Sequence, residues 1–176
     1  HTADSIFSDQ ADNTEAKFGQ ANVQLQLGLL FAELAKLDDA DAAYGAALDM
    51  LRTLAKESPG TVEYESTIAA SLLNRAALMI DQGEIGDATS VISDSVGQYE
   101  KVVQDNPGEP RFKLALAKAQ MILALIHINA DQLDRAAGPL ESAHGLLEAL
   151  PARHRRNFDY LEALAVAHFR NAHVHG

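Results

Sequence analysis

Cysteine is absent from this 176-residue chain. Its absence excludes disulfide bonds, zinc sites with thiolate ligands and enzymes that use a cysteine nucleophile. It leaves the compartment open, because proteins without disulfides occur both inside and outside the cytoplasm. We therefore expect either a cytoplasmic or an extracytoplasmic part of a protein.

Basic residues are few. The chain has 14 Lys and Arg against 25 Asp and Glu, which gives a formal net charge of -11. DNA, RNA and anionic lipid attract proteins through clustered Lys and Arg. The one such cluster, Arg153-His154-Arg155-Arg156, is short and typical of a solvated loop. The composition predicts no nucleic-acid partner and favours basic or neutral partners.

Long hydrophobic runs are missing as well. The longest runs, such as residues 119–129, fall short of the ~20 apolar residues that cross a bilayer, so we predict no membrane span within the chain. The chain begins with His1 and has neither the basic start nor the apolar core of a signal peptide. We expect it to be a fragment of a longer protein.

Sequence motifs for catalysis are also absent. The chain has no glycine loop for phosphate, no His-Glu-x-x-His motif and no nucleophile elbow. Its carboxylate pairs, such as Asp38-Asp39, fall at predicted helix starts, where they interact favourably with the helix dipole. We predict that the chain is not an enzyme and binds no cofactor.

The seven histidines do not form a metal-binding pattern. His168, His173 and His175 are near one another in sequence, but spacings of five and two do not stack on one helix face. We therefore predict no metal site. His127 falls on the side of its helix that faces the partner helix, and we expect it to be a hydrogen-bonded core residue.

The chain contains a 48-residue repeat without insertions. Small residues recur at this spacing in two series, Gly28, Ala76 and Ala124 in the first and Ala40, Ala88 and Ala136 in the second. Each repeat in such a protein is one supersecondary unit that stacks on its neighbours. We predict a single domain with repeats at 16–63, 64–111 and 112–159. Residues 1–15 would be the remnant of a preceding repeat, and 160–176 a capping helix or the first helix of a fourth repeat.

Apolar residues within each repeat fall at helical spacing, and no stretch alternates as a strand does. Ser58-Pro59-Gly60 and Asn106-Pro107-Gly108 separate the repeats, because proline cannot continue a helix. The pattern predicts two helices in each repeat. The seven predicted helices cover residues 13–36, 39–57, 61–82, 87–105, 109–130, 134–150 and 156–173.

Two local signals predict how some of these helices begin. Asp39, Asp87 and Asp134 are predicted N-caps, because a short carboxylate accepts hydrogen bonds from the free amides of the first turn. Gly138-Pro139 lies early in the sixth predicted helix. Since proline removes a backbone hydrogen bond and crowds the preceding turn, we predict a kink or a late start there.

The small residues of the two series are 12 positions apart in every repeat. A large apolar residue follows four positions later, at Tyr44, Ile92 and Leu140, and a further small residue three positions after that, at Ala47, Ser95 and Ala143. This pattern resembles the tetratricopeptide repeat, in which the small residues lie where paired helices cross. The resemblance implies an all-α fold, a right-handed α-solenoid of antiparallel helix pairs.

The repeat is longer than the family's usual unit of about 34 residues. The additional ~14 residues equal two helical turns in each helix, which preserves the face that each helix turns toward its neighbour. Units with such long helices resemble the repeat regions beside the kinase domain of some multidomain bacterial serine/threonine kinases.

The resemblance also implies a concave groove lined by the first helices. The matching residues are Leu25, Leu29, Leu73, Asn74, Ala77, Lys118, Met121 and Leu125. We expect about half of them to be core and the remainder to bind an amphipathic helix or an extended peptide. Chaperone-binding members hold a terminal carboxylate at five places, of which Asn74 and Lys118 match while Leu25, Leu29 and Ile122 do not. A carboxylate facing leucines would be unpaired, which predicts no affinity for acidic chaperone tails.

The sequence thus predicts a protein or peptide interaction scaffold. Two alternatives stay open: a structural spacer or oligomerisation element of a sensor kinase and, ranked lowest, a helical domain that binds a small molecule or metal. Because solenoids need polar caps at their ends, we also expect self-association through the C-terminal helix.

Overall fold

The computed structural model describes the backbone of residues 3–150 and the side chains of residues 13–150. Every regular element in this part of the chain is an α-helix. The six helices are α1 (Ala3–Glu33), α2 (Leu37–Glu57), α3 (Val62–Asp81), α4 (Ile85–Asp105), α5 (Pro110–Asn129) and α6 (Leu133–Glu148). The chain divides into two compact units between Glu84 and Ile85. This division lies inside the predicted second repeat.

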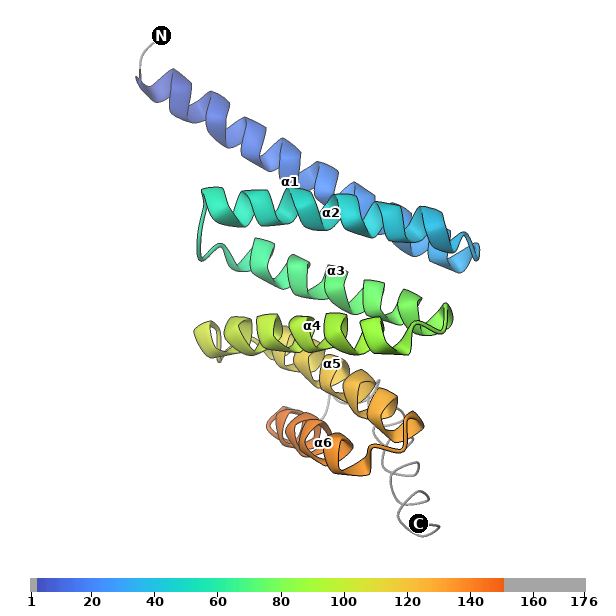
Figure 1. Ribbon diagram of the computed structural model, residues 1–176. Helices are drawn as coiled ribbons and strands as arrows, with labels where there is room; N and C mark the ends of the chain where they lie inside the picture. The colour runs from blue at the N-terminus through green and yellow to red at the C-terminus, as the bar shows by residue number, and fades with distance from the viewer. Residues whose placement is uncertain (1–2, 151–176) are drawn as a thin grey trace. The chain divides into compact units, whose positions relative to one another are not determined.

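Unit 1 contains α1, α2 and α3. The middle helix, α2, packs against both neighbours, while α1 and α3 meet over a short stretch (Figure 1). Phe18 of α1 and Tyr64 of α3 contribute to that stretch, with ring centroids 5.0 Å apart. The N-terminal part of α1 diverges from α2 in both ribbon views. Unit 1 is therefore held together mainly by α2.

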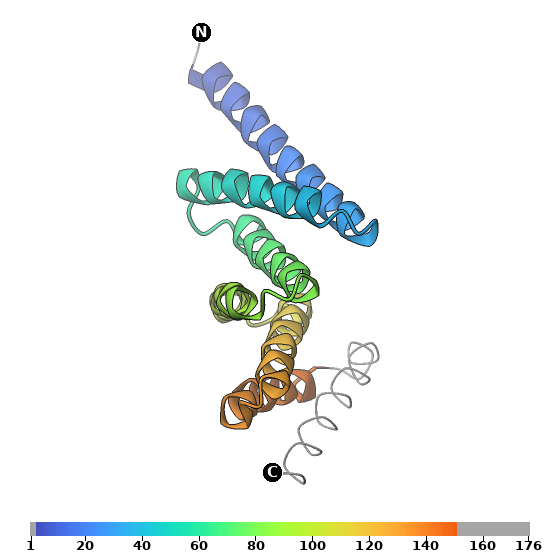
Figure 2. The same ribbon diagram turned by 45° about the vertical axis from the view of Figure 1, so that its right-hand side comes forward.

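Unit 2 contains α4, α5 and α6. Here α5 is the middle helix and packs against both α4 and α6 (Figure 2). Consecutive helices are antiparallel and joined by short turns in both units. The predicted fold class, an all-α solenoid of antiparallel helix pairs, is confirmed.

The helices form where apolar residues recur every three or four positions, because this spacing places them on one side of a helix. In α2 the buried residues are Ala40, Ala43, Tyr44, Ala47, Leu48, Leu51 and Leu54. The predicted bounds of the second to sixth helices agree with the structure to within about three residues. The predicted seventh helix, residues 156–173, lies outside the described residues.

The predicted start of the first helix is wrong. A break was expected near residue 13, but α1 continues without interruption from Ala3 to Glu33. No proline or glycine occurs between residues 3 and 18, so nothing in this stretch opposes helix continuation. The predicted repeat boundaries, including residues 1–15, stay predictions.

The predicted N-caps are also wrong. α2, α4 and α6 begin at Leu37, Ile85 and Leu133, one or two residues before the aspartates proposed as caps. Asp39, Asp87 and Asp134 therefore lie within the first helical turn. A carboxylate in this position still interacts favourably with the positive end of the helix dipole. The three helix starts are 48 residues apart.

One turn geometry ends α1, α3 and α5. In each case the backbone N–H groups of two consecutive residues beyond the helix donate to carbonyls of its last turn, and the first of these two residues adopts a positive φ. The residues are Ala35 (φ 55°), Gly83 (φ 80°) and Asp131 (φ 57°). After α1, Ala35 N donates to Ala32 O and Lys36 N to Phe31 O. After α3, Gly83 N donates to Ile80 O and Glu84 N to Met79 O. After α5, Asp131 N donates to Ile128 O and Gln132 N to His127 O. These are Schellman turns, and they too recur every 48 residues.

The late start predicted for the sixth helix is wrong. α6 begins at Leu133 and includes Pro139 in its interior. Because proline has no N–H, it cannot donate to the carbonyl of Arg135. The helix accepts this loss while Ala136, Ala143 and Leu147 remain buried, so burial of the apolar side outweighs one missing hydrogen bond.

Candidate interaction surfaces

The small residues of the two series all lie in the interior. The five alanines, Ala40, Ala76, Ala88, Ala124 and Ala136, have no exposed surface, and Gly28 is buried as well. Side chains of this size allow two helices to approach closely. The structure thus places these residues inside the units and not on a binding surface.

Gly28 of α1 lies directly against Tyr44 of α2. A Cβ atom added to Gly28 would be 2.5 Å from both Cδ1 and Cε1 of the Tyr44 ring, closer than non-bonded carbons can approach. Tyr44 is almost completely buried, and burial raises the pKa of its hydroxyl. This crossing therefore requires glycine because its partner is a full aromatic ring.

The predicted groove residues do not share one environment. Leu25, Leu73 and Met121 are buried, Leu29, Asn74 and Leu125 are partly buried, and Ala77 and Lys118 are exposed. Leu25 packs with Ala40, Tyr44 and Ala47, and Leu29 lies against the same cluster. Met121 packs with Ala143 and Leu147 of α6, and Leu125 lies beside them. The leucines and Met121 thus contribute to the core, while Ala77 and Lys118 are accessible to a partner.

The two residues that match the carboxylate-binding pattern lie in different units. Asn74 belongs to α3 in unit 1, and Lys118 belongs to α5 in unit 2. The predicted lack of affinity for acidic chaperone tails stays a prediction.

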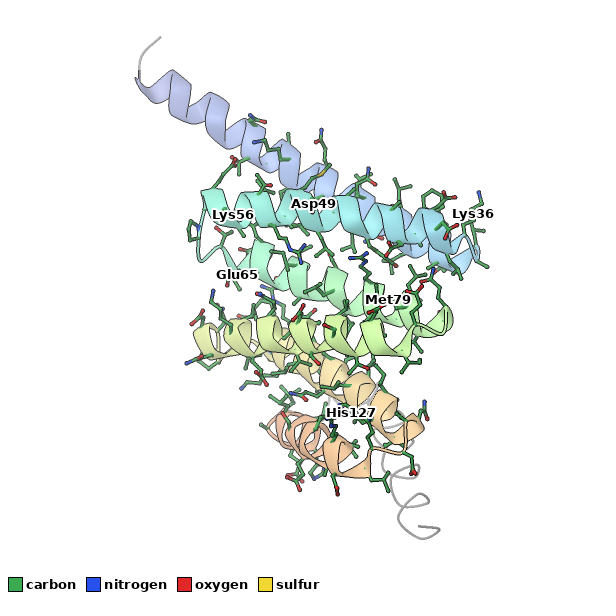
Figure 3. All side chains as sticks on the ribbon, viewed as in Figure 1. Lys36, Asp49, Lys56, Glu65, Met79 and His127 are labelled. Atoms are coloured by element: carbon green, nitrogen blue, oxygen red, sulfur yellow. The ribbon has the colours of Figure 1, made fainter. Side chains whose placement is uncertain are left out.

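His127 is a hydrogen-bonded core residue, as predicted. It lies at the end of α5, near the turn to α6 (Figure 3), and is 8% exposed. Its Nδ1 is 3.0 Å from Oε1 of Gln132. Since an amide oxygen only accepts hydrogen bonds, Nδ1 carries the proton and donates. The backbone N–H of Gln132 also donates to the carbonyl of His127, so the pair joins the end of α5 to the turn.

Arg75 and Asp41 form a bidentate ion pair between α3 and α2. Nε of Arg75 is 2.6 Å from Oδ1 of Asp41, and Nη2 is 3.1 Å from Oδ2. The hydrogen bond to Asp41 raises the pKa of the guanidinium above its already high value. The side chains are 31% and 38% exposed, so solvent screens part of their attraction.

The surface depressions of the described residues include three that are open to solvent. Two lie at equivalent turns, one of about 470 Å³ lined by Ala35, Lys36, Leu37, Asp38, Asp39 and Gln82, and one of about 610 Å³ lined by residues 131–135. The third, of about 320 Å³, lies between α1 and α2 and is lined by Lys17, Asp49, Met50 and Thr53. Open depressions of this kind give no support to small-molecule binding.

No group of three or more His, Asp or Glu residues within the described chain is arranged to hold a metal ion. The histidines His168, His173 and His175 lie outside the described residues. α5 is the one helix in residues 3–150 whose length and composition would allow it to cross a membrane, although its longest apolar run is short. However, 56% of its apolar 18-residue window is buried inside the structure, and a core helix meets the same criteria.

Exposed apolar residues gather on α1 and at Leu34, the residue directly after it, where the sequence analysis did not place a site. The backbone N–H of Leu34 still donates to the carbonyl of Leu30. Val23, Leu30 and Leu34 are 58%, 49% and 58% exposed. They are seven and four residues apart, a spacing that places them on one side of the helix. The signal was present in the sequence as a second apolar stripe, in addition to the one that contains Leu25.

Comparison with known proteins adds little to this description. No protein-family model matches the chain, and no curated protein matches it. A solved structure, that of PcrH from Pseudomonas aeruginosa, is 21% identical, and the match covers 92% of each chain with a TM-score of 0.39. A similarity at this level establishes neither the family nor the function of this chain.

Proposed function

We propose that this chain is a protein- or peptide-binding scaffold of the tetratricopeptide type, built from a long-helix repeat of 48 residues. The observation that carries the proposal is the recurrence of one helix-ending turn at Ala35, Gly83 and Asp131, together with helix starts at the same spacing. Stacked repeats present equivalent side chains from successive units, which is how solenoids build extended binding surfaces.

The exposed positions of the proposed surface are Ala77 on α3 and Lys118 on α5. Leu29, Asn74 and Leu125 are accessible in part. A partner that contacts these side chains would meet apolar groups at Leu29, Ala77 and Leu125 and a positive charge at Lys118, which suits an amphipathic helix or an extended peptide.

Photo-crosslinking tests this proposal. A photo-reactive amino acid is placed at Ala77 or at Lys118, and a matched control carries it at Asp94, an exposed position on the second helix of a repeat. We expect one protein to crosslink at both test positions and not at Asp94, and the purified protein to bind the chain. Equal crosslinking at all three positions, or none at Ala77 and Lys118, would contradict the proposal.

A second candidate function is a structural spacer or oligomerisation element, because exposed apolar residues on α1 could contact another copy. Light scattering distinguishes the two, since a dimer whose population rises with concentration favours the second. A position beside a bacterial serine/threonine kinase domain is a proposal from the family resemblance alone. The gene sequence on either side of residues 1–176 tests it.

A further inference from the structure

α1 carries two apolar stripes on opposite sides. The first, with Leu25, Leu29 and Ala32, packs against the cluster formed by α2. The second consists of Ala16, Val23, Leu27 and Leu30, with Leu34 directly after the last residue of α1. At 100° per residue these five lie within about 60° of one another. Val23, Leu30 and Leu34 of this second stripe are half exposed or more. A helix that is apolar on both sides is usually covered on both.

α5 shows what happens to the second stripe when a neighbour is present. Its residues at the places of Val23, Leu27 and Leu30 are Ala119, Leu123 and Ile126, each 96 positions later in the sequence. All three are buried. The first stripe of α5 packs against α6 through Ala117 and Met121, and α5 also packs against α4. Gln120 Nε2 donates to Glu100 Oε1 of α4 at 3.3 Å.

α3 gives the same result inside unit 1. Leu78 stands at the place of Leu30, 48 positions later, and is 2% exposed. It packs with Ala40, Tyr44 and Ala47 of α2, the helix that precedes α3 in the sequence. Ser71, at the place of Val23, is also buried. In unit 1, therefore, the preceding antiparallel helix α2 covers Leu78 of the second stripe of α3. In unit 2 the second stripe of α5 is buried and the preceding helix α4 packs against α5.

We infer that the second stripe of α1 is a docking site for an amphipathic helix of a partner protein, which lies on α1 as α2 lies on α3 and α4 lies on α5. Only three of its residues, Val23, Leu30 and Leu34, are large and well exposed, so the occupant needs an apolar stripe of two to three helical turns. The site lies on the opposite side of α1 from Leu25 and Leu29. It is thus separate from the groove of the proposed function.

The charges around the stripe select a basic partner helix. Glu15 and Glu33 are exposed and lie on the same edge of it. Lys17 is the one basic residue in positions 13–33, and its Nζ is 3.8 Å from Glu57 Oε2 on α2. The net charge of -11 opposes association with a second copy of this acidic chain. Leu27 of α1 stands at the place of Arg75 of α3, which pairs with Asp41 of α2. The occupant of the second stripe of α1 therefore needs no acidic residue opposite Leu27.

A peptide with the sequence of α4, residues 85–105, is the probe. Its acidic residues Asp87, Asp94 and Asp105 are exposed in the chain. Replacing these three with lysine leaves the buried face unchanged and keeps Glu100, which accepts a hydrogen bond from Gln120 of α5. The unaltered acidic peptide is the matched control. Calorimetry with the full chain should show micromolar binding of the lysine peptide and at least about tenfold weaker binding of the acidic one. Raising the salt concentration should narrow this difference.

Two variants of the full chain locate the site. In V23E/L30E, two carboxylates replace exposed apolar side chains, so the far-ultraviolet circular dichroism and Tm should stay unchanged while the lysine peptide binds at least about tenfold more weakly. Ala77→Glu adds a carboxylate to an exposed apolar position of the proposed groove and should bind the lysine peptide normally. Failure of Ala77 crosslinking would therefore count against the proposed function and leave this inference intact.

Three results would overturn the inference. The first is no binding of the lysine peptide at concentrations up to about 1 mM. The second is equal binding by the chain and by V23E/L30E, since the peptide would then lie elsewhere. The third is a dimer of the chain that V23E/L30E abolishes, since a second copy would then be the occupant.

Discussion

Unit 1 joins α2 to α3 with a bidentate ion pair between Asp41 and Arg75, whereas unit 2 has uncharged residues at the corresponding places between α4 and α5. These are Thr89 and Leu123, each 48 positions later. Thr89 donates its hydroxyl hydrogen to the carbonyl of Ile85 within α4. The comparison teaches that one helix interface can be formed with or without charges, provided that the apolar residues around it are kept.

The two units also differ at the helix crossing within a pair, which is α1 with α2 in unit 1 and α5 with α6 in unit 2. The difference lies in the sizes of the two residues that meet there. Unit 1 combines the smallest residue, Gly28, with the large ring of Tyr44. Unit 2 has Ala124 and Leu140 in the corresponding places. The smaller residue in the first helix thus accompanies the larger one in the second, as close packing at a helix crossing requires.

The largest effect is expected from adding a methyl group to the tighter of these crossings. Gly28→Ala would place a Cβ 2.5 Å from the buried Tyr44 ring, and the resulting strain should lower the free energy of unfolding by about 3 kcal/mol. The double variant G28A/Y44L reproduces the residues of unit 2 and should recover part of this loss. Urea denaturation followed by circular dichroism measures both. If Gly28→Ala is as stable as the original chain, the two crossings do not differ as described.

The buried hydroxyl of Tyr99 in unit 2 should make the free energy of unfolding depend on pH. Burial raises the pKa of its hydroxyl from 10.0 to about 12, so the unfolded chain loses this proton at lower pH than the folded chain. The stabilisation is complete below pH 10 and is lost as the pH rises toward 12, by roughly 2–3 kcal/mol. Tyr99→Phe has no proton to lose and should show a flatter decline in unfolding free energy between pH 9 and 11.5. If the unfolding free energy falls equally with pH in the original chain and in Tyr99→Phe, deprotonation of Tyr99 is not the cause of the fall.

Substitutions at the positive-φ position of the Schellman turns should change the free energy of unfolding by about 1 kcal/mol. Ala35 has a positive φ of 55° that alanine tolerates poorly, so Ala35→Gly should raise the free energy of unfolding by up to about 1 kcal/mol. Gly83 has the same role, and no atom lies within 4 Å of the place of its missing Cβ. Gly83→Ala should therefore lower stability by about the same amount through backbone strain alone. If both substitutions raise the free energy of unfolding, or both lower it, the two turns are not equivalent.

The smallest effect is expected for the ion pair of unit 1. Because both side chains are about one-third exposed, a double-mutant cycle with Asp41→Ala and Arg75→Ala should give a coupling of about 0.5–1 kcal/mol. High salt should reduce it. Thr89→Ala in unit 2 is the matched control and should show no dependence on salt. A coupling that salt leaves unchanged would point to side-chain contact in place of charge attraction.

The sequence predicted the helices well because their apolar spacing is a local property. It placed five of six helices to within about three residues and identified His127 as a core residue from its helix position. It failed at the start of α1, where the absence of Pro and Gly allows the helix to begin about ten residues earlier than predicted. The late start predicted near Pro139 was also wrong, because burial of the surrounding helix face offset a lost hydrogen bond. The alternative, a kink at Pro139, stays a prediction.

The candidate surfaces were harder to predict, because an apolar residue on a helix can face either a neighbour or solvent. Leu25 and Met121 match groove positions, yet both are buried against the second helix of a pair. Val23 and Leu30 were not singled out, yet they are among the most exposed apolar residues in the described chain. Helical spacing specifies that two residues share a side, but not what lies on that side.

The sequence by itself determined the all-α class, the lengths of α2 to α6 and the 48-residue spacing of the turns, because propensity, proline positions and apolar periodicity act over a few residues. Tertiary structure decided which of the two apolar stripes of each helix is covered. It did so because coverage depends on whether a second helix is present on that side: α5 has α4 and α6 as neighbours, while α1 packs mainly against α2.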